Sequence, residues 1–124
     1  DSGLEVDALK GAPGVFSARY AGNHKNNDAN IKKIWKKLKG QSSPKATFRS
    51  IFYIHFNNKT FSFQGKVDGN LIYDKRGLNG FGYDPIFIPN GYSQTFAELG
   101  DVVKNKISHR ALATVQFLKL LERA

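Results

Sequence analysis

Three short segments of the sequence combine residue types that can bind an anionic ligand or activate water. The first is DSG at residues 1–3, in which a carboxylate, a hydroxyl and a glycine follow one another. The carboxylate of Asp1 could hold Mg²⁺ or orient a water molecule, and Gly3 could let a phosphate approach the backbone. The same tripeptide is also common in turns, so a purely structural interpretation stands beside the chemical one.

The second segment is GFGYDP at residues 80–85, which places an aromatic ring between two glycines. The glycines could expose Phe81, so that a flat ligand stacks on its ring. Pro85 disfavours helical backbone at the preceding residue and therefore predicts an extended Asp84. The alternative is a β-bulge that carries an ordinary core phenylalanine. The segment lacks the third glycine and the helix start of a dinucleotide-binding fingerprint.

The third segment is KNKISHR at residues 104–110, which places Lys104, His109 and Arg110 at a predicted helix entrance with Ser108 as the cap. Free backbone N–H groups and cationic side chains together make an anion site. Cations at this end oppose the helix dipole, and they cost stability unless an anion balances them. The alternative is an ordinary capped helix with solvated charges.

The rest of the chain must position these segments. Residues 29–39 predict a helix with Asp28 as N-cap and Gly40 as its end, because the apolar residues follow the spacing of one helix face: Ile31, Ile34, Trp35 and Leu38. The opposite face is either solvated or a nucleic-acid surface, and it carries Lys32, Lys33, Lys36, Lys37 and Lys39.

Several strands are predicted around this helix. Residues 46–56 alternate well and pair with residues 60–69 through an Asn-Asn-Lys turn, with a further short strand at 71–73 and one strand between two turns within 76–92. One face of the first of these strands carries Phe48, Phe52, Ile54 and Phe56, and the other carries Arg49, Ile51, Tyr53 and His55. Residues 2–9 also predict a strand, whose sheet neighbours we expect upstream of the chain, and residues 10–22 predict a turn and a short helix or loop.

Two further helices complete the prediction. Thr95 and Glu98 form a capping-box pattern, and the last helix, after Ser108, is expected to bury the face that carries Ala111, Val115, Leu118 and Leu121. The order of elements predicts a mixed α/β or α+β arrangement in one domain, or part of one, spanning residues 1–124.

Composition narrows the functional classes. With 40% hydrophobic residues the chain can form a packed core, and with no Cys it excludes disulfides, thiolate chemistry and cysteine metal sites. We expect a cytoplasmic protein with no membrane segment. The net charge of +9 suggests nucleic acid, but residues 25–49 carry eight of the 19 basic residues and a single acid, so only one segment is strongly basic.

Taken together, the segments at 1–22, 80–99 and 104–111 resemble, in order, the signature segments of the inosine triphosphate pyrophosphatase family, which acts on non-canonical purine nucleoside triphosphates. The resemblance extends to about residue 115 and is weakest across 23–70. It implies hydrolysis of ITP, dITP or XTP to the monophosphate and pyrophosphate, with Mg²⁺, in a homodimer. It also implies an elongated mixed α/β sheet with an antiparallel hairpin and flanking helices.

The resemblance assigns roles to individual residues. Asp1 matches the general base and metal ligand, Ser2 a substrate contact, and Phe81 the ring that stacks on the purine. The other matched substrate contacts are Gly82, Tyr83, Asp84, Lys104, His109 and Arg110. Within this set, His109 and Arg110 match the pair that reads the base edge, where a 6-keto acceptor is favoured over an amino group.

The family's N-terminal strand, phosphate-binding Lys and metal-binding Glu have no counterpart in residues 1–124. We therefore expect this chain to be the C-terminal part of a longer protein, inactive by itself and able to associate with its missing segment. Two alternatives remain open: a nucleic-acid-binding module that uses the lysine-rich helix at 29–39, which we do not favour, and an inert fragment that associates with itself.

Overall fold

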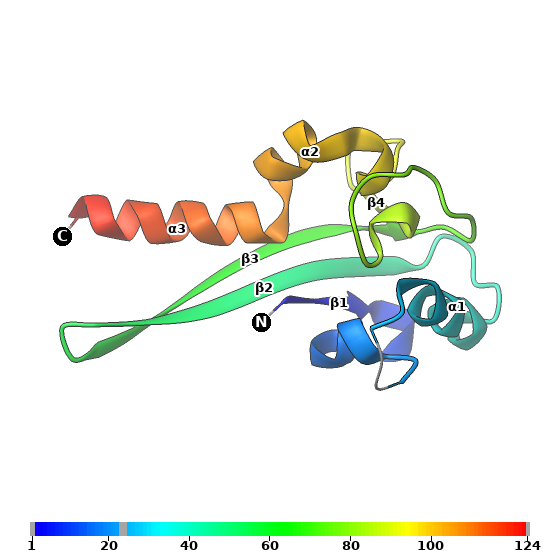
Figure 1. The fold of residues 1–124 in the computed structure, drawn as a ribbon, viewed down its shortest axis with the longest axis horizontal. Coiled ribbons are helices and arrows are strands. Elements are labelled where there is room, and N and C mark those ends of the chain that lie inside the picture. Colours follow the sequence, from blue (N-terminus) through cyan, green and yellow to red (C-terminus); the bar gives the residue numbers. More distant parts are fainter. Residues whose placement is uncertain (1, 23–24, 124) are drawn as a thin grey trace.

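The computed structural model describes residues 2–22 and 25–123, and at residues 109, 111 and 123 it describes the backbone alone. Its strands form one sheet with antiparallel neighbours in chain order: β1 (Ser2–Val6), β2 (Lys45–Phe56), β3 (Lys59–Leu71) and β4 (Phe87–Pro89). The helices are α1 (Asn27–Leu38), α2 (Phe96–Ile107) and α3 (His109–Arg123), with short 3-10 turns η1 (Asp7–Leu9), η2 (Gly14–Arg19) and η3 (Asp84–Ile86) (Figure 1). The predicted mixed α/β class is confirmed.

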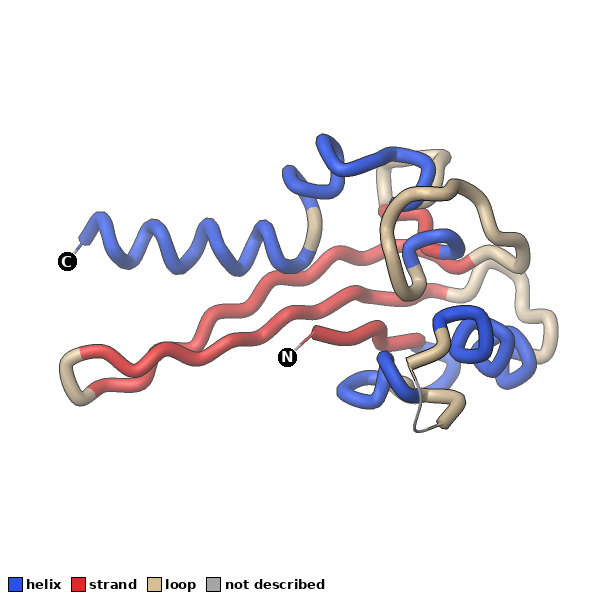
Figure 2. Tube along the Cα trace, in the orientation of Figure 1, coloured by secondary structure: helices blue, strands red, loops and turns tan. Residues whose placement is uncertain are grey.

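The hairpin of β2 and β3 extends well beyond the two outer strands (Figure 2). Its turn is formed by Asn57 and Asn58, which have φ angles of 50° and 62°. A two-residue turn whose twist matches the strands needs positive φ at both positions, and asparagine tolerates this. The predicted hairpin is confirmed. The separate strand predicted at 71–73 is wrong, because Leu71 is the last residue of β3. The Asp68-Gly69-Asn70 segment resembles a turn, but it stays paired with β2 on one side, and Gly69 and Asn70 pair with β4 on the other.

Strand β1 is shorter than predicted, because residues 7–9 turn into η1. It pairs with β2 from Ser2 opposite Ser50 to Val6 opposite Ala46, so the expectation of upstream neighbours is wrong for this edge. The other edge contacts the following loop. The N–H of Leu4 donates to Ser17 Oγ at 2.8 Å, and the N–H of Val6 donates to the Ala12 carbonyl at 3.0 Å.

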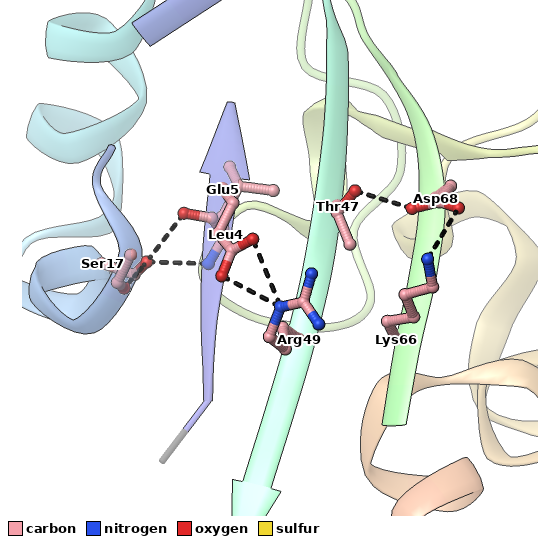
Figure 3. A network of polar contacts seen from close by, with 8 residues as sticks. Leu4, Glu5, Ser17, Thr47, Arg49, Lys66 and Asp68 are labelled. Atoms are coloured by element: carbon pink, nitrogen blue, oxygen red, sulfur yellow. Dashed lines mark hydrogen bonds and ion pairs between the residues drawn. The ribbon is translucent and has the colours of Figure 1, made fainter. Parts of the chain in front are cut away.

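Polar side chains connect β1, β2 and β3 on the sheet face opposite to the one that carries Leu4 and Phe48 (Figure 3). Arg49 Nε donates to both carboxylate oxygens of Glu5, at 3.1 and 3.3 Å. Thr47 donates to Asp68 at 2.7 Å, and Lys66 lies 3.9 Å from the same carboxylate. Partly exposed pairs of this kind contribute about 0–1 kcal/mol each. Their main consequence is register, since a shift by one residue would turn these charges toward the core.

Helix α1 buries the predicted apolar face: Ile31, Ile34 and Leu38 are at most 1% exposed. The predicted N-cap is wrong. Asn26 takes this position and its side chain accepts the N–H of Ala29, because the helix begins at Asn27. Asp28 lies in the first turn and forms an ion pair with Lys75, at 2.7 Å.

Helix α2 begins with the predicted capping box. The Thr95 hydroxyl accepts the Glu98 N–H, and the Glu98 carboxylate accepts the Thr95 N–H. The helix is interrupted at Gly100, whose φ of 80° and ψ of 178° lie in a region that is essentially restricted to glycine. This break turns the second part of α2 away from the direction set by its cap. Ser108 follows in extended backbone, and its carbonyl accepts the N–H of Leu112 as α3 begins.

Helix α3 packs against the hairpin through a different face from the predicted one. Ala113 is fully buried, and the Phe117 ring lies 5.5 Å from the Phe63 ring and 6.3 Å from the Phe52 ring. The predicted face is about half exposed at Val115, Leu118 and Leu121. Apolar residues occur around most of this helix, so helical spacing alone did not identify the side that packs. No helix in the described part of the chain is long and apolar enough to cross a membrane.

Candidate functional site

A cavity of about 300 Å³ lies where the start of β1, the loop before η3 and the junction of α2 and α3 meet. Its walls include every predicted site residue whose side chain is described: Ser2, Phe81, Gly82, Tyr83, Asp84, Lys104 and Arg110. These residues are far apart in the sequence, so the fold rather than local spacing brings them together. The predicted catalytic base Asp1 lies outside the described residues, as does the His109 side chain, and their roles stay predictions.

Phe81 presents an exposed ring at the cavity. Phe81 is 59% exposed, the Lys104 ammonium lies 4.2 Å from the ring centroid, and the Arg110 guanidinium carbon lies 5.6 Å from it. The β-bulge alternative is wrong, because the segment forms a loop that leads into η3. An exposed aromatic ring beside two cations suits a ligand that is flat and negatively charged.

Asp84 supports this wall from within. Its carboxylate is almost completely buried, accepts a hydrogen bond from the Lys104 ammonium, and accepts the backbone N–H of Phe81 at 3.0 Å. The predicted extended backbone at Asp84 is wrong, because this residue opens η3. One oxygen of this buried carboxylate, Oδ2, therefore accepts from both the Lys104 cation and the backbone that carries the exposed ring.

The predicted position of Lys104 at a helix entrance is wrong. Lys104 lies in the last turn of α2, where a cation is favoured by the helix dipole. Arg110 lies in the first turn of α3, and its Nε donates to the Ser2 hydroxyl at 3.3 Å. The two cations therefore reach the cavity from opposite ends of two helices.

Gly3 has a structural requirement that the sequence alone did not reveal. A Cβ at this position would lie 2.2 Å from the Gly14 carbonyl oxygen, so only glycine lets η2 approach β1. The expectation that Gly3 admits a phosphate to the backbone is not supported where its Cβ would lie, because Gly14 occupies that space. Ser2 belongs to strand β1, so the turn interpretation is wrong for this residue.

Tyr83 ties the cavity wall to η2. Its hydroxyl is buried and donates to the Ser17 carbonyl at 2.6 Å. Burial, and to a lesser degree the neighbouring Tyr20, raises the pKa of Tyr83 above the ordinary value for tyrosine. The raised pKa stabilises the folded state fully at pH values below about 10, and this contribution is lost as the pH rises above that value.

Replacing Tyr83 by phenylalanine is therefore expected to lower the free energy of unfolding by about 1 kcal/mol, because the Ser17 carbonyl loses its buried donor. Chemical denaturation at pH 7 measures this difference. In the native protein, absorbance titration should show phenolate formation at Tyr83 only as the protein unfolds in alkali. Tyr92 is partly exposed and serves as the matched control, since its change to phenylalanine should leave the stability unaltered. A Tyr83 variant as stable as the wild type would contradict the assigned hydrogen bond.

Some cavity residues were missed by sequence reasoning. Asn30 is 2% exposed, donates to the Ala18 carbonyl at 2.9 Å and accepts the Ala21 N–H at 2.8 Å, so it joins α1 to η2 and to the residues that follow it. A polar residue directly beside the apolar stripe of α1 was the available signal. Lys25 also lines the cavity, from a loop whose residues carry no motif.

The lysine-rich helix lies mostly outside this site. Lys32, Lys36 and Lys37 are exposed, whereas Lys33 donates to the Tyr20 carbonyl at 2.7 Å and covers its ring. This is the pattern of a solvated helix face with one structural lysine. Within the described residues, no three His, Asp or Glu side chains are grouped so that they could hold a metal ion.

The fold and the cavity define an α/β protein in which strand and helix ends surround an exposed ring and two cations. The chain belongs to the Ham1 family, whose model matches residues 1–120. This assignment confirms the resemblance noted from the sequence.

Individual relatives agree with the family assignment. The chain is 48% identical over 122 residues to the dITP/XTP pyrophosphatase of Porphyromonas gingivalis, covering 98% of this chain and 63% of that protein. It is 47% identical over 125 residues to the dITP/XTP pyrophosphatase of Bacillus subtilis, covering 98% and 63%. This chain thus spans somewhat less than two thirds of these relatives.

Solved structures show the same fold. The Staphylococcus aureus Ham1 protein superposes with a TM-score of 0.94 at 43% identity, covering 98% of this chain and 64% of that one. A HAM1 protein from Coxiella burnetii gives 0.94 at 39% identity, covering 100% and 66%.

Proposed function

We propose that the protein hydrolyses non-canonical purine nucleoside triphosphates, such as ITP, dITP and XTP, to the nucleoside monophosphate and pyrophosphate. In this reaction water attacks the α-phosphorus and pyrophosphate leaves. The observation that carries the proposal is the exposed Phe81 ring with the Lys104 and Arg110 cations at 4.2 and 5.6 Å, in a chain of the Ham1 family.

The base is selected by polar groups beside the ring. A purine stacked on Phe81 would lie next to Lys104 and Arg110, which can donate hydrogen bonds and cannot accept them. The 6-keto oxygen of hypoxanthine or xanthine is an acceptor and suits such donors. The 6-amino group of adenine is a donor, so it would leave buried donors without acceptors, which is costly. His109 is proposed to act with Arg110 at this edge.

The catalytic step is assigned to Asp1, as general base toward the attacking water. Mg²⁺ would neutralise phosphate oxygens when bound. The described residues do not fit this ion by themselves, because the Asp84 carboxylate is bonded to Lys104 and the Glu5 carboxylate to Arg49. Within this chain, Asp1 is therefore the proposed ligand for Mg²⁺.

Calorimetric binding of ITP and of ATP tests the proposal, in the protein at its full encoded length with Mg²⁺ present. We expect ITP to bind on the order of 100-fold more tightly than ATP, with pyrophosphate released from ITP. Equal affinity for the two nucleotides, or binding of neither, would overturn the proposal. Binding that is indifferent to the base and falls steeply with salt would instead identify the nucleic-acid alternative.

A homodimer and a cytoplasmic setting complete the proposed function. Both follow from the family resemblance and the composition, and sedimentation analysis of the purified protein measures the first.

A further inference from the structure

Ser50 lies directly behind the cavity wall without forming part of it. It is opposite Ser2 in the pairing of β1 with β2, and the two hydroxyl oxygens are 3.0 Å apart. Ser50 is only 5% exposed, whereas Ser2 lines the cavity. A buried hydroxyl in the middle of a strand is therefore bonded to a hydroxyl that a ligand can reach.

Which serine donates in this hydrogen bond follows from the donors and acceptors around Ser2 and Ser50. The Arg110 guanidinium can only donate, so Ser2 Oγ is the acceptor of its Nε–H. A serine hydroxyl has one proton and two acceptor sites. If Ser2 also accepted the Ser50 proton, both of its acceptor sites would be filled and its own proton would be available to the cavity.

The reverse direction satisfies fewer groups. If Ser2 donated to Ser50, the Ser50 proton would remain in a buried position, and among the described residues no side chain other than Ser2 bonds to the Ser50 hydroxyl. A buried donor without an acceptor is unfavourable. In contrast, a Ser2 proton that faces the cavity can be accepted by water or by a ligand oxygen.

We propose that Ser50 is a positioning residue that donates to Ser2, so that the Ser2 hydroxyl holds Arg110 with its oxygen and offers its proton to an oxygen of the bound nucleotide. This inference rests on the proposed function. The hydrogen bonds from Ser50 to Ser2 and from Arg110 to Ser2 orient the Ser2 hydroxyl and the Arg110 guanidinium at the same wall of the cavity. Ser50 does not touch the ligand and acts only through Ser2.

The test compares Ser50→Thr with Ser50→Val in the protein at its full encoded length. Threonine and valine add the same volume to this strand position and both favour strands, but only threonine keeps the hydroxyl. We expect Ser50→Thr to bind ITP like the wild type and Ser50→Val to bind it about fivefold more weakly, as for the loss of one hydrogen bond. Calorimetry measures the affinities, and thermal unfolding without ligand measures the fold.

Combining Ser50→Val with Ser2→Ala separates positioning from general destabilisation. The Ser2→Ala variant already lacks the hydroxyl through which Ser50 is proposed to act, so adding Ser50→Val should not weaken ITP binding further. Equal ITP affinity of the Thr and Val variants, or an undiminished effect of Ser50→Val in the Ser2→Ala background, would overturn the inference. If the wild type binds no purine nucleotide, the proposed function fails, and this inference fails with it. If the wild type binds ITP selectively, the variants test only the proposed role of Ser50.

Discussion

Replacing Asp84 by asparagine is expected to lower the free energy of unfolding by about 3 kcal/mol, because it leaves the Lys104 ammonium without its buried partner. The Lys104 side chain is 16% exposed and that of Asp84 is 5% exposed, so water can replace the lost charge only in part. The same change should reduce the preference for ITP over ATP on the order of tenfold. An ammonium that is no longer fixed above Phe81 attracts any anionic nucleotide and selects less well among bases.

A double variant distinguishes these two effects. Asp84→Asn combined with Lys104→Met removes both charges, so most of the stability should return, since an apolar replacement of a buried pair is often neutral. The preference for ITP should not return, because the donor beside the ring is gone. Chemical denaturation and calorimetry measure the two quantities. An Asp84→Asn protein with unchanged stability and unchanged preference would show that the pair contributes nothing to the site.

Replacing Phe81 by alanine is expected to weaken ITP binding on the order of 10- to 100-fold, since stacking of a base on an aromatic side chain is worth about 1–3 kcal/mol. The free energy of unfolding should change by less than about 0.5 kcal/mol, because Phe81 is 59% exposed in the absence of ligand. Calorimetric titration with ITP gives the affinity, and denaturation gives the stability.

Leu78 provides a matched control in the same loop. It is a large apolar side chain that is fully exposed, and it does not line the cavity. Leu78→Ala should leave both the affinity and the stability unchanged. If Phe81→Ala binds ITP as well as Leu78→Ala does, the ring is not the stacking platform, and the proposed site loses its main support.

Local signals in the sequence predicted a large part of the fold. The two asparagines of the hairpin turn, the Thr95 capping box and the apolar stripe of α1 each specify their structure through neighbouring residues, and each is confirmed. Other elements depend on contacts between distant residues. The packed face of α3 was predicted wrongly because the hairpin selects it, through Phe52 and Phe63 against Phe117.

The candidate site shows the same division. Seven of the residues that line the cavity were predicted from three motifs, and the fold brings these seven together. Their geometry could not be predicted, because it arises from the burial of Asp84 beneath Phe81 and from the placement of Lys104 at the end of α2. The motif at 104–110 looked like one helix entrance, and Ser108 in extended backbone divides it between two helices. Asn30 lies in the cavity wall and Ser50 lies behind it, and no sequence motif marked either residue.

Because α2 is interrupted at Gly100, the direction of the Lys104 side chain depends on how many residues separate it from that break. Lys104 is the fourth residue after Gly100, and each residue turns a helix by about 100°. Inserting one residue between them would rotate the ammonium away from Asp84 and Phe81 while leaving every wall residue in the sequence. Removing the break, for instance by Gly100→Ala, would have a similar effect, because that backbone conformation is essentially closed to a side chain. We therefore expect the number of residues between Gly100 and Lys104 to influence nucleotide selectivity even when the motif residues stay the same.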